Sequence, residues 1–323
     1  MLLLLLLWLC AEGIFRILSG SNLIENPRYG TCCIEFDKKT AIAEQVVKTK
    51  QNLDVIFLGN SMVDMGIDPE TFSNTYASLS GENISAVNFG LLTLSVSPAG
   101  KLSQFLARRY HPRLIVYGTT PRDFLDYRGE FSRPLRGDPW ILYNTGEFSA
   151  AGWLVDNSYA YRYLVDFRHL FNPAFTEQVK FLRENPHTSY GFLPQQGNYQ
   201  EEENPKTLVE DYEASQRDLV GLKEIISLSN EKTRVVILEM PFDPKFAPYY
   251  MKGGIESYES LFVNPIAKIL ASNDVEFWRT QPEIEKIVPP DAWQSNLHLN
   301  INGATEFTRY LASGVYSNHF LPK

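Results

Sequence analysis

Five short apolar runs, three of them closed by glycine, constrain the fold of this 323-residue chain more than any other feature. Short β-branched runs without polar alternation are typical of strands buried on both faces of a sheet. The three glycines are each followed by small or polar residues. The runs are DVIFLG (54–59), SAVNFG (85–90), RLIVYG (113–118), RVVILEMP (234–241) and the weaker DVEFW (274–278).

Stretches with helical spacing lie between these runs. They are residues 40–51, 97–110, 212–230, 260–273 and a last helix that begins near Asn302. Strands that alternate with helices predict an α/β fold, in which a parallel sheet is covered by helices on both faces. In such sheets the functional residues gather at the carboxyl ends of the strands.

Residues 127–210 interrupt this alternation. They are rich in Tyr, Phe, Arg, Asn and Pro and contain no clear strand. We therefore predict a mainly helical insertion after the third strand, placed as a cap over the strand ends. Its aromatic side chains are interpreted either as the insertion's own core or as a platform on which a sugar or acyl chain stacks.

The N-terminal segment, residues 1–18, is apolar for its first eleven residues and then reaches Glu12 and Arg16. A spanning helix needs about 20 apolar residues and a signal peptide needs a basic start, and neither is complete here. We interpret it as an uncleaved membrane anchor, with a cleaved signal or a buried helix as alternatives. Residues 19–39 are predicted as a spacer and 40–323 as the main domain, outside the cytoplasm or at the membrane face.

Charge and cysteine content exclude several classes of protein. The net charge is −8, and Lys and Arg do not cluster into a basic stripe, so nucleic acid is not an expected partner. Cys10, Cys32 and Cys33 show no zinc-type spacing, and neighbouring cysteines rarely bridge each other. We therefore expect no metal. No GxGxxG or GxxxxGK[ST] run follows a strand, so we expect no nucleotide cofactor either.

Three residues beside the predicted strand ends could carry chemistry. Ser61 follows Gly59-Asn60, and a serine at a strand-to-helix turn can project its hydroxyl above the sheet, or can simply cap the helix. Gly90 could offer its N–H to a substrate oxygen or merely end its strand. His298 precedes the last helix. The other histidines have no matching spacing and are predicted at the surface or in packing: His111, His169, His187 and His319.

Four motifs along the chain share one order with a known family. FLGNSMVDMGIDP, VNFGLLTLSVSP, VYGTTPRDF and SNLHLNINGATEFTRYLA make the chain resemble the SGNH (GDSL-like) hydrolases. The resemblance is closest to a membrane-anchored bacterial branch that includes the alginate O-acetylation proteins. It covers about residues 52–124 and 233–313, and it implies a flavodoxin-like, three-layer α/β/α sandwich.

The resemblance also implies roles for individual residues. Ser61 matches the nucleophile and His298 the base, while the backbone N–H groups of Ser61 and Gly90 match donors to the oxyanion. This set suits acyl transfer, because a serine hydroxyl needs an imidazole to take its proton and the tetrahedral oxyanion needs fixed donors.

The chain departs from the family pattern at two positions. Thr120 stands where the family has an oxyanion-binding Asn, and it can offer only a hydroxyl. Ser295 stands where the family has the Asp that orients the histidine. Asp291, seven residues before His298, is the candidate replacement, although it could be an ordinary loop acid and a backbone carbonyl could orient the ring. Asp123 is interpreted as a helix cap or salt-bridge partner.

The sequence therefore supports two functions. The first is an esterase or O-acyl (acetyl) transferase that acts on an acylated envelope polysaccharide or a related small molecule. In the transferase case a membrane protein would deliver the acyl donor. The second is an SGNH-fold protein without catalysis that binds glycan or scaffolds an envelope assembly.

Overall fold

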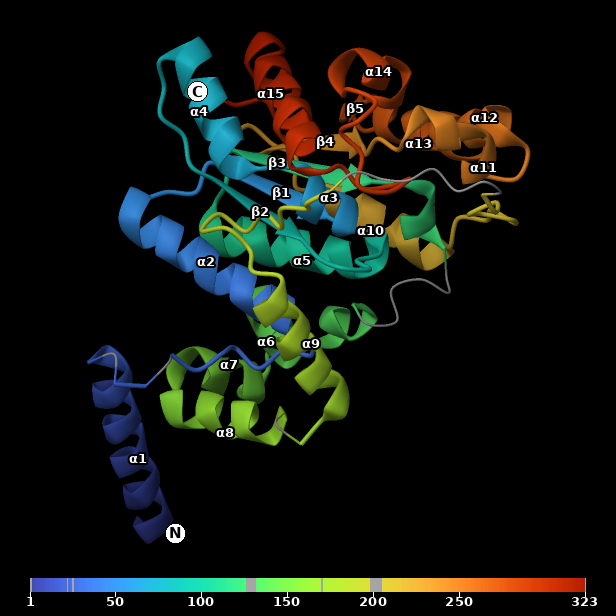
Figure 1. Cartoon of the computed structure of the whole chain (residues 1–323). Helices are drawn as coiled ribbons and strands as arrows, with labels where there is room; N and C mark the ends of the chain where they lie inside the picture. The colour runs from blue at the N-terminus through green and yellow to red at the C-terminus, as the bar shows by residue number, and fades with distance from the viewer. Residues whose placement is uncertain are drawn as a thin grey trace.

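The fold is built around one parallel sheet, shown in Figure 1. The computed structural model describes residues 2–21, 23–24, 26–125, 132–169, 171–197 and 205–322. The strands are β1 (Val55–Gly59), β2 (Ala86–Gly90), β3 (Leu114–Thr119), β4 (Arg234–Glu239) and β5 (Glu276–Trp278). The helices are α1 (Leu2–Gly20), α2 (Ile34–Lys50), α3 (Ser61–Gly66), α4 (Pro69–Ser80), α5 (Val96–Tyr110), α6 (Pro139–Asn144), α7 (Ala150–Asn157), α8 (Tyr159–His169), α9 (Pro173–Glu184), α10 (Gln216–Ile226), α11 (Ala247–Tyr250), α12 (Gly254–Ser257), α13 (Asn264–Ala271), α14 (Ile284–Ile287) and α15 (Ile301–Ser317), with short turns η1 (Pro121–Phe124), η2 (Arg133–Gly137), η3 (Pro244–Phe246), η4 (Tyr258–Val263) and η5 (Gln281–Glu283).

The strand order is β2-β1-β3-β4-β5, which is the flavodoxin-like order of a doubly wound sheet. Every residue of β1, β2 and β3 is buried, as the unbroken apolar runs predicted. The register places Gly59 of β1 beside Gly90 of β2 and Gly118 of β3. The three glycines that close the apolar runs thus form one row at the carboxyl edge of the sheet.

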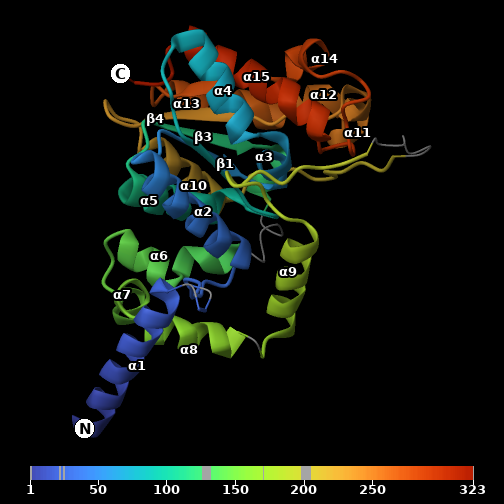
Figure 2. The same cartoon turned by 60° about the vertical axis from the view of Figure 1, so that its left-hand side comes forward.

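Helices cover both faces of the sheet. Helices α4, α13 and α15 lie on one face, and α2, α5 and α10 lie on the other (Figures 1 and 2). This arrangement confirms the predicted three-layer α/β sandwich.

Helix α2 begins at Ile34, inside the segment predicted as a spacer. Phe36 is fully buried and its ring packs against Phe89 and Phe105, while Lys39 has no exposed surface at all. Residues 34–39 therefore belong to the domain, and the predicted spacer boundary at residue 39 is wrong. The sequence hid this because the start of α2 carries several charged residues that usually lie at a surface.

The insertion is helical, as predicted, but its helices do not cap the strand ends. In α6, Trp140 stacks on Tyr29 and packs edge-on against Phe105 of α5. Helices α6, α7 and α8 thus form a further layer beneath α2 and α5 (Figure 2). The stretch after α9 returns to the sheet, where Tyr190 O accepts a hydrogen bond from Asn88 N of β2. Ser132, before α6, also reaches this end of the sheet, since its Oγ donates to Thr93 O in the loop after β2. Residues 127–131, 170 and 198–204 of the predicted insertion lie outside the described residues.

Helix α1 lies beside α7 and α8, and its N-terminal end extends past them (Figure 1). Within the described ranges it is the one helix long and apolar enough to cross a membrane, with a mean hydropathy of 2.0 over its best window. A signal sequence near the N-terminus passes the same test of length and composition.

Candidate active site

Ser61 lies at the point where the strand order reverses, between β1 and β3. It is the first residue of α3, and Asn60 caps that helix by accepting a hydrogen bond from Met62 N at 2.7 Å. A side chain at Gly59 would meet Gly118 O at 2.4 Å, so only glycine allows the chain to turn so closely here. In doubly wound sheets, this crevice is where ligands bind.

His298 meets Ser61 although the two are 237 positions apart in the chain. Its Nε2 lies 3.0 Å from Ser61 Oγ, which is hydrogen-bond distance. A tight turn before α15 presents the ring: His298 O accepts hydrogen bonds from Gln294 N at 2.8 Å and Ser295 N at 3.1 Å. The structure therefore brings together the predicted nucleophile and the predicted base.

Ser295, in the family's aspartate position, contacts the other ring nitrogen of His298. The distance from Ser295 Oγ to His298 Nδ1 is 2.9 Å. The same Oγ accepts hydrogen bonds from His298 N at 3.1 Å and Leu297 N at 3.3 Å. A hydroxyl has two lone pairs and one proton, and the two backbone N–H groups occupy both lone pairs. The Ser295 hydroxyl can therefore interact with Nδ1 only by donating its proton to it. Counting bonds in this way assigns the ring proton to Nε2, where it points at Ser61 Oγ.

The imidazole of His298 is a weak base in this setting. Burial, followed by the positive charge of Arg122, lowers its pKa to about 4, and the carboxylate of Asp64 opposes this only in part. The ring is therefore neutral at pH 7. In serine hydrolases an aspartate beside Nδ1 holds the ring in the productive tautomer and stabilises the imidazolium; Ser295 offers no charge for that purpose.

Asp291 does not take over the orienting role. Its side chain is exposed, its backbone carbonyl accepts a hydrogen bond from Asn300 Nδ2 at 3.0 Å, and it is not among the charges that shift the pKa of His298. The position at Nδ1 is occupied by Ser295 instead.

The two other predicted oxyanion donors have intramolecular partners. Gly90 N donates to Asn88 Oδ1 at 2.7 Å, and a side chain at Gly90 would lie 2.2 Å from Asp64 N. Gly90 thus lets α3 approach β2 closely. Thr120 N donates to Asp123 Oδ2 at 2.8 Å, and the Thr120 hydroxyl lies 3.2 Å from the same oxygen. Neither residue presents a free donor beside Ser61.

Asp123 caps η1, as predicted, and also ties the ends of two strands together. Its Oδ1 accepts a hydrogen bond from Asn60 Nδ2 at 2.7 Å, so the residue before Ser61 is held by the turn that follows β3. Burial raises the pKa of Asp123 to about 6, against the hydrogen bonds from Asn60 and Thr120 that favour its charged form.

A small cavity of about 60 Å³ adjoins the Ser61 hydroxyl. Arg122 forms part of its wall, and the buried Nε of this residue has no hydrogen-bond partner. A buried unpaired donor is costly, and a guanidinium in the wall of this cavity favours a negatively charged atom nearby. The lining residues are Asn60, Ser61, Met62, Thr93, Leu94, Arg122 and Asp123.

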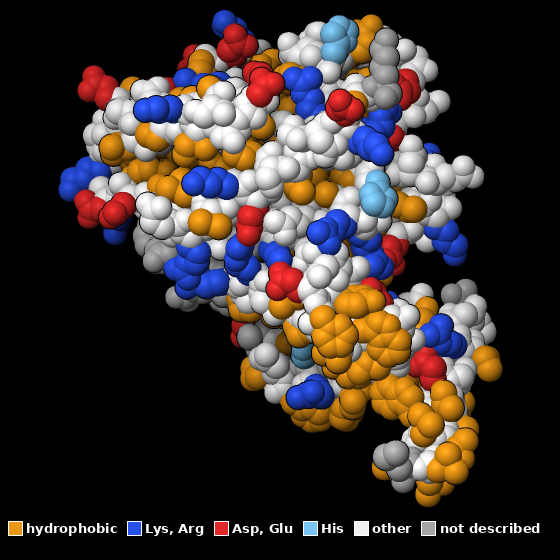
Figure 3. Space-filling view, turned by 180° about the vertical axis from the view of Figure 1, so that it is seen from behind, with side chains coloured by type: hydrophobic (Ala, Val, Ile, Leu, Met, Phe, Trp, Pro, Cys, Tyr) orange, Lys and Arg blue, Asp and Glu red, His pale blue; other side chains and the backbone are white. Residues whose placement is uncertain are grey.

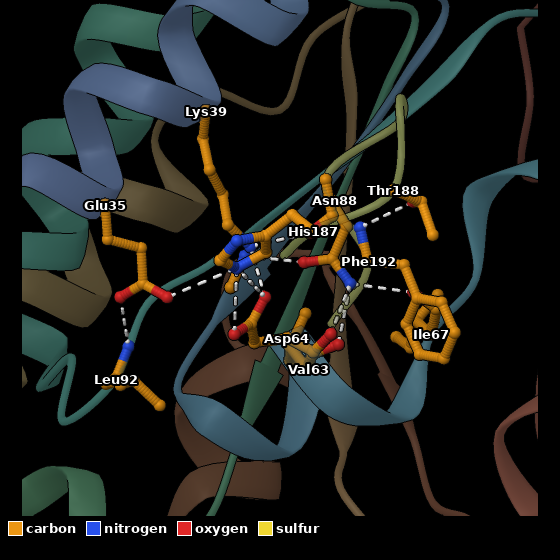
Figure 4. Close-up of polar contacts among 12 residues, drawn as sticks. Glu35, Lys39, Val63, Asp64, Ile67, Asn88, Leu92, His187, Thr188 and Phe192 are labelled. Atoms are coloured by element: carbon orange, nitrogen blue, oxygen red, sulfur yellow. Dashed lines mark hydrogen bonds and ion pairs between the residues drawn. The ribbon is translucent and has the colours of Figure 1, made fainter. Parts of the chain in front are cut away.

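A buried group of ionisable side chains gathers around Asp64, three residues after Ser61 in the chain (Figure 4). We call Glu35, Lys39, Asp64 and His187 the buried charge cluster. Lys39 Nζ pairs with Asp64 and donates to Gly191 O at 2.8 Å. His187 Nε2 lies 3.2 Å from Asp64 Oδ1 and 3.4 Å from Glu35 Oε1. His187 is therefore buried among charges, a placement that its isolated position in the sequence did not indicate.

The buried charge cluster combines possible metal ligands with an internal ion pair. Glu35, Asp64 and His187 have the donor types for a divalent cation and lie close enough to hold one. However, the ammonium of Lys39 already pairs with Asp64. Burial alone would raise the pKa of Asp64, but Lys39 and then His187 hold this pKa below its usual range. The pKa of Glu35 is raised, first by burial and then by the nearby charge of Asp64.

The members of the cluster come from three different segments of the chain. Glu35 and Lys39 come from α2, Asp64 from α3 itself and His187 from the stretch that follows α9. Glu35 Oε2 also accepts a hydrogen bond from Leu92 N at 2.8 Å, in the loop after β2. The cluster thus joins the nucleophile helix to α2, to this loop and to the returning end of the insertion.

We expect Lys39→Met to destabilise the fold by about 3–5 kcal/mol, because it leaves the buried carboxylate of Asp64 without its cation. Urea unfolding of the full chain measures this free energy. Lys48→Met, on the exposed end of the same helix, is the matched control and should change stability by less than about 0.5 kcal/mol. A loss of less than about 1 kcal/mol for Lys39→Met would show that the pair does not anchor α3.

Comparisons with known proteins return solved structures only. No family model matches the chain, and no curated protein matches it. A lipase/acylhydrolase from Enterococcus faecalis is 12% identical with a TM-score of 0.41, covering 84% of this chain and 99% of that one. A GDSL-like lipase from Parabacteroides merdae is 13% identical with a TM-score of 0.39, covering 82% and 98%.

A gut microbial diltiazem-metabolizing enzyme is also similar, at 14% identity and a TM-score of 0.40. The match covers 81% of this chain but only 47% of that enzyme, so the chain spans about half of its length. GDSL-like lipases and acylhydrolases are thus among the proteins that this chain resembles in structure.

Proposed function

We propose that this chain is an SGNH-type serine esterase or O-acyltransferase of the membrane-anchored, extracytoplasmic kind. One observation carries the proposal: Ser61 Oγ lies 3.0 Å from His298 Nε2 at the switch point of a flavodoxin-like sheet. A hydroxyl paired with an imidazole at a strand-to-helix turn is the arrangement that nucleophilic acyl transfer requires.

In the proposed reaction Ser61 Oγ attacks the acyl carbonyl, and its proton passes to His298 Nε2 once the ring carries its own proton on Nδ1. The tetrahedral oxyanion is stabilised by Ser61 N–H and by the guanidinium of Arg122. Ser61 N has no partner within α3, since it is the first residue of that helix. His298 then returns the proton to the departing alcohol. Water, or a sugar hydroxyl in a transferase, releases the acyl group from Ser61.

The cavity beside Ser61 favours a small acyl group. Its volume of about 60 Å³ holds only a few atoms, which suits acetyl better than a fatty acyl chain. We therefore propose an acetylated envelope polysaccharide, or a related small acetyl ester, as the substrate. A membrane protein that supplies the acyl donor belongs to the transferase version of this proposal.

A second function is favoured by the incomplete support around His298. Ser295 supplies no charge, the pKa of His298 is lowered to about 4, and Gly90 N already donates to Asn88. A protein that uses the same crevice only to bind glycan would tolerate all three features.

Labelling with a fluorophosphonate probe separates the two functions. For the enzyme we expect one adduct per full-length chain, located at Ser61 by peptide mass spectrometry, and hydrolysis of an acetate ester faster than of an octanoate ester. The absence of an adduct at Ser61, in a mixture where a known serine hydrolase reacts, would favour the binding protein.

A further inference from the structure

Helix α1 is fastened to the insertion by hydrogen bonds and does not hang free. The Glu12 carboxylate caps the start of α8: it accepts hydrogen bonds from Tyr159 N at 3.1 Å, Ala160 N at 3.0 Å and Ser158 Oγ at 2.8 Å. A carboxylate at a helix start satisfies N–H groups that otherwise have no partner.

Two further contacts hold α1 in place beside α7 and α8. Arg16 Nη2 donates to Asn157 O at 2.7 Å, at the end of α7. The ring of Phe15 stacks on Tyr163 of α8 with centroids 4.5 Å apart. The direction of α1 is therefore set by the insertion.

These contacts all come from the second half of α1. Its first half, Leu2–Ala11, extends past α8 (Figure 1). Most of this half is exposed and wholly apolar, with Leu2 at 73% and Leu7 at 59% exposure. Such a surface is unfavourable in water and suits the interior of a bilayer.

An apolar patch lies on the insertion next to α1, as the hydrophobic side chains at the lower part of Figure 3 show. Leu164, Phe167 and Phe171 are spaced by three and four positions, so they share one face of α8 and its end. Phe171 is 74% exposed and Phe148, before α7, is 91% exposed. Trp153 of α7 is 49% exposed. We call these five residues the aromatic patch.

An apolar groove of about 640 Å³ joins the aromatic patch to α1. Trp8 and Phe15 of α1 form one wall, and Tyr163, Leu164 and Phe167 of α8 form the other. Leu164 and Phe167 of the patch are thus continuous with the apolar side of α1. Patches of this kind on a monomer usually mark an interaction site.

We propose that α7, α8 and the first half of α1 together form a membrane-seating surface, whose partner is a phospholipid bilayer. The rigid joint between α1 and α8 carries this inference: inserting α1 into a bilayer brings α8 down onto its surface. Phe, Trp and Leu are the side chains that interfacial helices bury at headgroup depth. Arg168 is exposed and directly follows Phe167 of the patch, where it can contact lipid phosphates.

The surface also fixes where the proposed active site stands. The layer of α2, α5 and α10 lies between the insertion and the sheet, so Ser61 is held away from the bilayer (Figure 2). Resting on the proposed function, this placement favours a substrate presented from the aqueous side, such as an envelope glycan, over a membrane lipid.

Tryptophan quenching by brominated phospholipids tests the membrane-seating surface. The full chain is reconstituted into phosphatidylcholine vesicles, and the quenched fraction of its fluorescence is compared among variants. Trp153→Phe should lower this fraction, because it removes a tryptophan that touches lipid. Trp293→Phe, the control in the buried core, should raise it. If both variants raise the quenched fraction, Trp153 does not touch the bilayer and the proposal fails.

A charged variant of the patch gives a second, independent measurement. In wild type, we expect vesicles to slow amide hydrogen exchange in α7 and α8 at least fivefold. The double variant Leu164→Glu with Phe167→Glu should lose most of this slowing. Leu79→Glu, exposed on α4, should leave it unchanged. Slowing in detergent that depends on protein concentration would instead indicate a second copy on this surface. Labelling of Ser61 is measured separately, in detergent, so failure of the membrane test leaves the proposed function standing.

Discussion

Ser61→Ala is expected to abolish fluorophosphonate labelling and to lower the rate of acetate ester hydrolysis by about 10⁴-fold or more. The reason is that Ser61 Oγ is the atom paired with His298 Nε2 at 3.0 Å, and alanine leaves no group that can form the acyl intermediate. Steady-state kinetics of the full-length chain with a chromogenic acetate ester measures the loss. The effect should fall on kcat, with KM little changed.

Ser78→Ala is the matched control, because Ser78 is an exposed serine of α4 far from the cavity. This variant should react with the fluorophosphonate probe and hydrolyse the acetate ester at the wild-type rate. A Ser61→Ala variant that keeps the wild-type rate, with an intact fold by circular dichroism, would exclude Ser61 as the nucleophile. The chain would then be a binding protein, or an enzyme whose site lies elsewhere.

The architecture of the sheet was predictable from the sequence because it depends on local patterns. The first three strands are buried on both faces, as their short apolar runs VIFLG, AVNFG and LIVYG predicted. The pairing of Ser61 with His298 was also predictable, since each belongs to a recognisable motif at an expected strand or helix end. The edge strand β5 is only three residues long, which matches its weaker signal.

The support around the site was not predictable, because it depends on contacts between distant segments. Gly90 occupied the expected position, yet its N–H is taken by the side chain of Asn88 two residues earlier. Lys39 and Glu35 have the spacing of a solvated ion pair on a helix, and nothing in the sequence shows that both are buried. His187 joins them only through the path of the insertion, which the aromatic composition of that segment could not reveal.

The same reasoning explains why the insertion was misplaced. Its position after β3 suggested a cap over the strand ends, but Trp140 finds its apolar partners on Tyr29 and Phe105. Those partners lie on α5 and just before α2. Aromatic content indicated that the insertion packs, and only the tertiary structure shows against what.

Ser295→Asp is expected to raise kcat for ester hydrolysis by about 10- to 1,000-fold, in contrast to nearly every substitution in an active site. In wild type the Ser295 hydroxyl donates to His298 Nδ1, by the bond count above, and leaves the ring proton facing Ser61. A carboxylate can only accept, so it draws the ring proton to Nδ1 and frees Nε2 to act as base. In a serine protease, the wrong histidine tautomer lowers kcat by about 10⁴-fold. This loss sets an upper limit on the gain in kcat expected from Ser295→Asp.

The same change should move the pH dependence in a defined direction. Only neutral His298 can act as base, so the wild-type rate should fall as the pH drops through about 4, its lowered pKa. An aspartate beside Nδ1 stabilises the imidazolium and raises that pKa toward the ordinary value of about 6.5. The acid limb of the rate profile should therefore shift upward by one to two units, roughly, and NMR titration of the ring should follow it.

Ser295→Asn is the matched control, because it has the size of aspartate without the charge. It should give neither the gain in kcat nor the shift of the acid limb. If Asp and Asn behave alike, the charge at this position does not limit the reaction. If Ser295→Asp moves the pKa of His298 but leaves kcat unchanged, the missing oxyanion donors at Gly90 and Thr120 are the limit instead. Only Ser61 N–H and Arg122 would then stabilise the oxyanion. Loss of a single oxyanion donor typically lowers kcat by about 10²- to 10³-fold.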